Sequence, residues 1–187
     1  MKISVILIML LFLLNGCTHF SPKNNSSTSG TSASYTAARS DLTSDICLVY
    51  MYTNYAWGYQ CHGSFFDADG YQYSFDFSDL PRDLSDTDRI DLMREIRNDA
   101  TVHKQTFSAG DMEYMLNTMA CVNENTGFVE TNIMYDYGQR TVYGVRYEND
   151  TPKFVRLYSY GDWTQEPIDV NAAKIVNRFF TQVPRPN

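Results

Sequence analysis

The chain has 187 residues, a formal net charge of −7 at pH 7 and 14 tyrosines. This length is sufficient for one domain with its own hydrophobic core. The acidic balance argues against binding to nucleic acid and against direct electrostatic binding to anionic lipid. A basic or neutral partner is compatible with it.

The N-terminus has the pattern of an export signal. Met1 and Lys2 form a short basic start, and the apolar run that follows extends from Ile3 to Leu14. At about 1.5 Å rise per residue, a helix of this length is shorter than the ~30 Å hydrocarbon core of a bilayer. We therefore expect a removable signal peptide rather than a transmembrane helix. An ordinary secretory signal that happens to contain a cysteine is the alternative.

The apolar run ends in Leu14-Asn15-Gly16-Cys17, which resembles the lipobox of bacterial lipoproteins. The resemblance covers only the leader. It implies cleavage after residue 16, attachment of a diacylglyceryl group to Cys17, and acylation, for example with palmitate. Asn15 departs from the family pattern, in which a small apolar or hydroxylated residue is commoner. Several acyl chains anchor a protein stably, so we expect an extracytoplasmic, lipid-anchored protein at the cell membrane or the outer membrane.

The stretch that begins at Cys17 differs in composition from the rest of the chain. Residues 17–42 are rich in Ser, Thr and Asn and contain few large apolar side chains. Such a segment cannot bury enough surface to offset the entropy lost on ordering, so we expect a flexible tether. Residues 43–187 would then form a single domain held at a distance from the membrane.

The domain contains grouped strands and helices. We predict an α+β fold in which a mostly antiparallel sheet of about six strands carries three helices on one face, in the order βββ-αα-βββ-α. Short β-branched and aromatic runs predict strands at 46–52, 60–66, 71–77, 128–135, 141–147 and 154–160. Capping residues followed by apolar stripes predict helices at 86–98, 109–122 and 169–182.

Two turns set the expected strand pairing. Residues 67–70 form an acidic turn that ends in glycine and lies between the second and third strands, a pattern typical of a hairpin. If this turn has two residues, Ser64 faces Tyr73, and most aromatic side chains of the hairpin share one face. Residues 136–138 are expected to turn the fourth strand into the fifth in the same way.

Three cysteines fall in the domain. A hairpin of the first two strands centred near Asn54 would place Cys47 opposite Cys61, which makes a disulfide feasible and leaves Cys121 outside that bridge. Three reduced cysteines in the core are the alternative. A cysteine nucleophile is disfavoured, because adjacent strand residues point to opposite faces and His62 therefore cannot easily serve Cys61.

Metal binding is not indicated by the sequence. Asp67 and Asp69 form part of a D-x-D-G sequence, a fragment of a calcium-binding loop, but the further ligands of an EF-hand are missing. A plain turn is favoured. The chain has 3 histidines, too few for the usual zinc site, so we expect neither a metal nor another cofactor.

Aromatic side chains in turns predict a binding surface. Tyr55, Trp57, Tyr137 and Trp163 fall between the expected strands. Turns lie at the surface, and exposed Tyr and Trp are good contact residues for proteins and sugars. Most other aromatic residues are assigned to the sheet and its core.

Three functions are compatible with these features. The leading hypothesis is a non-enzymatic lipoprotein whose domain binds a protein or glycan of the cell envelope through the turn aromatics. An inhibitor or immunity-type lipoprotein that neutralises a basic toxin or lytic enzyme is the first alternative, and the acidic charge suits it. The second is an envelope hydrolase that uses acids such as Asp76, Asp136 or Asp162.

Overall fold

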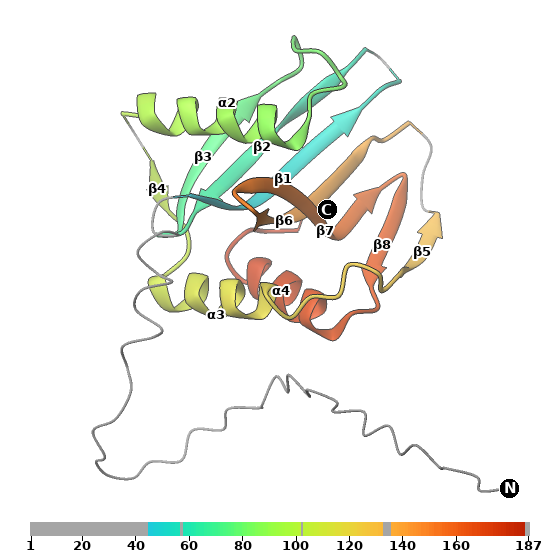
Figure 1. The fold of residues 1–187 in the computed structure, drawn as a ribbon. Helices are drawn as coiled ribbons and strands as arrows, with labels where there is room; N and C mark the ends of the chain where they lie inside the picture. The colour runs from blue at the N-terminus through green and yellow to red at the C-terminus, as the bar shows by residue number, and fades with distance from the viewer. Residues whose placement is uncertain (1–44, 57, 102, 133–135, 186–187) are drawn as a thin grey trace, which may run out of the picture. The chain divides into compact units, whose positions relative to one another are not determined.

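The computed structural model describes residues 45–185 except residues 57, 102 and 133–135 (Figure 1). The predicted signal peptide, the predicted tether and Cys17 lie outside the described residues. The described part contains one antiparallel sheet of eight strands and three helices, so the predicted α+β class is confirmed. Within these ranges no helix is long and apolar enough to cross a membrane.

Two antiparallel groups of strands join in one sheet. The strands are β1 (Ile46–Asn54), β2 (Gln60–Asp67), β3 (Tyr71–Asp76), β4 (Lys104–Gln105), β5 (Phe128–Asn132), β6 (Gln139–Glu148), β7 (Thr151–Gly161) and β8 (Trp163–Pro167). The helices are α2 (Asp86–Asp99), α3 (Ala109–Met119) and α4 (Val170–Phe179). Across the sheet the order is β4-β3-β2-β1-β6-β7-β8-β5, so β1 and β6 join the two groups.

The sheet is larger than the sequence predicts, and one predicted strand pairing is wrong. β4 has two residues, and β8 is polar and ends in Pro167, so neither gives a clear strand signal. The strand that begins at Phe128 does not pair with β6, whose two neighbours are β1 and β7. It forms β5 and pairs with β8 at the far edge. Its side chains are mostly exposed, which suits an edge strand.

The turn between β2 and β3 has three residues rather than two, and this shifts the register by one position. Phe65, not Ser64, faces Tyr73, so the predicted pairing is wrong. Gly70 has a φ of +85° in this turn, a left-handed conformation that glycine adopts without strain. Because a shift of one residue exchanges the two faces of a strand, Phe65 lies with Tyr73 on one face and Phe66 lies on the other.

Helices cover both faces of the sheet, not one (Figure 1). α2 lies against a cluster of buried residues that includes Phe65, Ile90 and Met93. α3 and α4 pack together on the other face, against a second cluster that includes Phe66 and Phe179. Successive residues of the central strands contribute to opposite clusters, so these strands are buried on both faces. The predicted one-sided arrangement is therefore wrong.

The three predicted helices are confirmed, although α4 begins at Val170 and ends at Phe179 rather than spanning residues 169–182. Ser85 before α2 and Ser108 before α3 each accept a hydrogen bond from the third helical N–H, and an aspartate there bonds back to the cap. Asp169 caps α4 by accepting from two N–H groups. α3 ends at Met119 rather than at residue 122, because Val122 N–H bonds to Met119 O in a tighter turn.

Candidate functional site

One edge of the sheet is open along most of β3. β4 pairs only with Tyr71 and Gln72, and no described residue pairs with the rest of β3 on that side. On the β2 side, Phe77 N–H donates to Cys61 O, 2.6 Å away. Main-chain groups alternate in direction along an antiparallel strand. Those of Ser74 therefore point toward the open edge.

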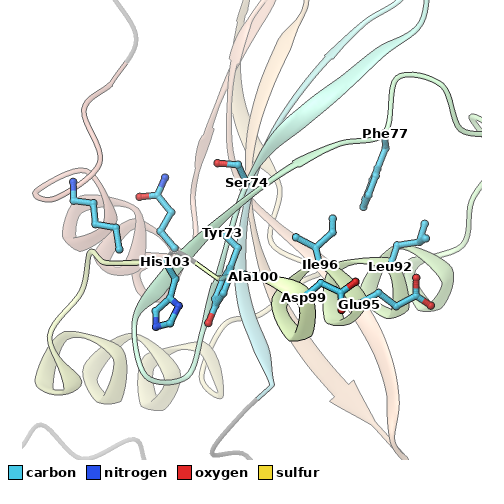
Figure 2. Close-up of a pocket in the computed structure, with 11 residues that line it drawn as sticks. Tyr73, Ser74, Phe77, Leu92, Glu95, Ile96, Asp99, Ala100 and His103 are labelled. Atoms are coloured by element: carbon cyan, nitrogen blue, oxygen red, sulfur yellow. The ribbon is translucent and has the colours of Figure 1, made fainter.

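A groove lies between β3 and α2, beside this edge (Figure 2). Its volume is about 840 Å³, within the range typical of ligand sites. Tyr73 and Phe77 form the strand side of the groove, and Leu92 and Ile96 face them from α2 (Figure 2). Polar side chains also line it: Gln72, Ser74, Glu95, Asp99, His103 and Lys104. We call this cavity the β3–α2 groove.

Tyr73 is held in one orientation on the strand side of the β3–α2 groove. Its ring stacks on Phe65 with centroids 5.0 Å apart and on His103 with centroids 5.8 Å apart. Its hydroxyl donates to Asp67 Oδ2 at 3.0 Å. Burial and this hydrogen bond raise the pKa of Tyr73 to about 12, so the hydroxyl stays protonated. This wall of the groove is therefore preformed.

Asp67, the last residue of β2, has a structural use in the β2–β3 turn. Asp67 is buried, and its Oδ1 accepts hydrogen bonds from the N–H groups of Asp69 and Tyr71. Its other oxygen accepts from Tyr73. These bonds fix the turn and engage both carboxylate oxygens. No group of three or more His, Cys, Asp or Glu side chains suited to a metal ion occurs in the described part of the chain.

The expected disulfide between Cys47 and Cys61 is not formed. The connection between β1 and β2 is longer than expected, so Asn54 pairs with Gln60 and Cys61 pairs with Thr53. Cys47 lies at a bulge near the other end of β1. The two cysteines are buried in different clusters on opposite faces of the sheet, and both are free.

The environment of the cysteine thiols does not favour a nucleophile. Burial raises the pKa of Cys47 to about 12, which keeps the thiol protonated. Cys61 is fully buried beside Met51, whereas its neighbour His62 is exposed. Cys121 is half-buried just after α3.

The structure brings two of the turn aromatics together. Tyr137 lies in the turn before β6 and is 37% exposed, and Trp163 is the first residue of β8 and is 48% exposed. Tyr137 N–H donates to Asp162 Oδ1 at 2.7 Å, and the side chain of Gln139 bonds to the main chain of Trp163. Tyr55, on the β1–β2 turn, is 61% exposed. Its ring contacts a different set of side chains, those of Tyr59 and Arg82, and Trp57 lies outside the described residues.

The three acids considered for a hydrolase do not share a cavity described here. Asp76 accepts a hydrogen bond from Ser78 N–H, and bonds from Ser78 hold the pKa of Asp76 below its ordinary value. Asp162 accepts from the main chain of the residue 136–138 turn. Asp136 is an exposed turn residue with a φ of +63°. The lining of the β3–α2 groove includes none of them.

The sequence does not single out the β3–α2 groove. Leu92 and Ile96 fit the apolar stripe of a helix, and such a stripe normally indicates burial. In α2 only Ile90 and Met93 are buried, and Leu92 and Ile96 are partly exposed. The sequence signal that could have indicated the groove is therefore the width of the apolar stripe of α2, which has more apolar side chains than the sheet buries.

Comparisons of this chain with protein-family models, with curated proteins and with solved structures find no match.

Proposed function

We propose that this chain is a lipid-anchored, extracytoplasmic binding protein that takes up an extended segment of another envelope protein along the open edge of β3. The observation that carries the proposal is the position of the β3–α2 groove directly beside that edge. Strand addition uses both features, because main-chain hydrogen bonds supply affinity and pockets for alternate side chains supply specificity.

The bound segment would continue the line of β4. β4 occupies the edge opposite Tyr71 and Gln72. A segment laid beyond it meets the main-chain groups of Ser74 and Asp76, which are exposed residues of β3. Side chains of a strand alternate between its two faces, so every second side chain of the segment would face α2 and enter the groove.

The charges along the groove favour a segment that presents both apolar and basic side chains on its face toward α2. Glu95 and Asp99 are exposed on α2 where it borders the groove. The whole chain is also acidic, with a net charge of −7. Complementary charge speeds encounter and fixes the orientation of a partner. The inhibitor or immunity hypothesis is one form of this function, since a basic toxin or lytic enzyme would present such a segment.

The anchor belongs to the same proposal. The lipobox-like residues that end at Cys17 and the polar composition of residues 17–42 support it. A lipid group at Cys17 would keep the protein at the membrane. The tether would hold the domain away from the membrane surface, where a partner segment can reach the edge.

A pair of substitutions at one position tests the strand-addition step. Ser74→Pro removes the N–H that points to the open edge and leaves the ladder to β2 intact, because proline is accepted on the free side of an edge strand. Ser74→Ala keeps this N–H and is the matched control. A photo-reactive amino acid in place of Leu92, in the full-length chain in bacterial membranes, captures the molecule that lies in the groove.

Mass spectrometry of the captured product identifies the segment. We expect capture with Ser74→Ala and roughly tenfold less with Ser74→Pro, since main-chain hydrogen bonds are lost. A synthetic copy of the segment should bind the full-length chain in detergent, and N-methylation of alternate residues should abolish binding. Equal capture by both variants contradicts the proposal. Capture only from a probe at Trp163 would assign the site to the turn aromatics instead.

A further inference from the structure

A second cavity lies on the opposite face of the sheet, beside the end of α4. Its volume is about 100 Å³. Its lining consists of aromatic and basic residues: Tyr50, Arg140, Tyr158, Tyr160, Phe180 and Arg185. No carboxylate lines it, although the whole chain carries a net charge of −7. The local charge is therefore opposite to that of the molecule.

Arg140 is held in place without being neutralised. Its guanidinium carbon lies 4.8 Å from the centroid of the Tyr52 ring and 5.5 Å from that of Tyr137. Its Nη1 atom is buried and has no hydrogen-bond partner in the described structure. A buried polar group without a partner is unfavourable.

Arg185 supplies the second guanidinium. Its guanidinium carbon lies 4.8 Å from the centroid of Phe180 and 5.4 Å from that of Tyr158. Contact with ring faces leaves the N–H groups available in the guanidinium plane. Neither Arg185 nor Arg140 forms an ion pair with a described acidic residue.

Tyrosine hydroxyls complete the set of donors. Burial raises the pKa of Tyr50 and of Tyr158, so both hydroxyls stay protonated at neutral pH. A protonated tyrosine hydroxyl can donate one hydrogen bond. The cavity therefore combines two forked cationic donors with neutral donors and apolar ring faces.

We propose that this cavity, the Arg140–Arg185 pocket, binds a carboxylate group. The planar fork of a guanidinium matches a carboxylate with two parallel hydrogen bonds. The small volume admits the carboxylate and little more than a methyl or methylene group. A small organic acid and an acidic side chain of a protein present this same group. The pocket is distinct from the β3–α2 groove, so it adds a second ligand site to the proposed function.

A pair of isosteric ligands tests the charge requirement. Sodium acetate is compared with acetamide, which has nearly the same size and no charge, with sodium chloride added to match the ionic strength. The thermal unfolding midpoint of the full-length chain in detergent is the readout, because a ligand that binds only the folded state raises it. We expect acetate to raise the midpoint and acetamide to leave it unchanged.

Two arginine variants locate the site. Arg185→Gln changes an exposed side chain and should weaken acetate binding roughly tenfold, since a charge-assisted hydrogen bond is lost. Arg156→Gln is the matched control, because Arg156 is likewise exposed and lies over an aromatic ring, 4.6 Å from the centroid of Phe128. Equal responses to acetate in the two variants would overturn the proposal. So would equal effects of acetate and acetamide on the parent chain.

Further ligands distinguish the source of the carboxylate. N-acetylglutamate methylamide is compared with its glutamine counterpart. Binding of the glutamate compound, weakened by Arg185→Gln, assigns the pocket to an acidic side chain of a protein, and binding of acetate alone assigns it to a small organic acid. Stronger stabilisation by inorganic phosphate than by acetate contradicts a carboxylate site.

Discussion

The two faces of the sheet differ in how completely helices cover them. On the face of α3 and α4, Phe179 is fully buried, and its ring lies 5.5 Å from Phe66 and 5.6 Å from Phe107 between centroids. On the face of α2, a single helix leaves Leu92 partly exposed in the wall of the β3–α2 groove. Two helices therefore cover one face, whereas the single helix on the other leaves apolar side chains partly exposed beside the β3–α2 groove.

Truncation of a large side chain on each face gives the largest expected difference. Phe179→Ala should lower the free energy of unfolding by about 3–5 kcal/mol, because it removes buried area and leaves a cavity. Leu92→Ala should lower it by about 1 kcal/mol or less, because this side chain is only partly buried. Urea unfolding followed by circular dichroism measures both. Similar losses would remove the distinction between the faces.

A substitution at Gly70 tests whether the turn that leads into β3 depends on close packing against Phe107. Its turn carries β3, but an added Cβ would lie 2.3 Å from Phe107 O, and φ is +85°. Gly70→Ala should therefore cost about 1–3 kcal/mol in the free energy of unfolding. Gly127→Ala is the control, since its nearest contact would be 3.9 Å away, and it should change stability by less than about 0.5 kcal/mol. An equal effect of both variants would contradict the strain at Gly70.

Removal of a helix cap should cost about the same free energy of unfolding on either face of the sheet. Ser85 caps α2 and Ser108 caps α3 with the same reciprocal hydrogen bonds. Ser85→Ala and Ser108→Ala should each cost about 1 kcal/mol in urea unfolding, because the lost bonds are local. A much smaller loss for Ser85→Ala would show that α2 frays independently, which would sharpen the contrast between the faces.

The smallest expected effect comes from the ion pair that ties α2 to the beginning of β1. Arg94 Nη2 lies 2.6 Å from Asp45 Oδ2. Burial acts to raise the pKa of Asp45, but hydrogen bonds from Arg94 and from the Ile46 N–H outweigh it, so the folded pKa lies below 3.8. The stabilisation is therefore present above about pH 4 and is lost as the pH falls through the folded pKa.

Asp45→Asn should cost up to about 1 kcal/mol at pH 7, since the pair is partly exposed. The difference from the parent chain should shrink as the pH falls below 4, where the parent carboxylate also becomes neutral. Urea unfolding at several pH values from 7 to 2 measures it. A difference that stays constant over this range would show that the ion pair does not stabilise α2.

The elements that the sequence predicts well are those set by local chemistry. The capping serines before residues 86 and 109 place the beginnings of α2 and α3 correctly, because cap and helix lie within one turn of chain. The β2–β3 hairpin is also local, but its register depends on whether Gly70 belongs to the turn. Two-residue and three-residue turns share this composition, so the sequence alone does not decide which face Phe65 occupies.

The non-local pairings and the candidate sites could not be predicted in this way. β5 pairs with β8 because both edges of β6 are occupied, and this depends on the whole sheet. The β3–α2 groove exists because the single helix α2 does not cover the whole of its face of the sheet. In the Arg140–Arg185 pocket, Tyr50 lies on β1 and Arg185 lies after α4. The exposure of Tyr137 was easier to predict, since this residue lies in a short connection, whereas Trp163 is exposed as the first residue of β8.

The short length of β4 has a consequence for any molecule that pairs with β3. Lys104 and Gln105 fill the first positions of the edge and close one end of it. A partner segment can extend only as far as this stop, so its terminus or a bend must lie there. Sliding by one residue would turn its apolar side chains away from the groove. In the proposed complex, the chain's own two residues would thus act as an end-stop that favours one alignment and limits the bound length to a few residues.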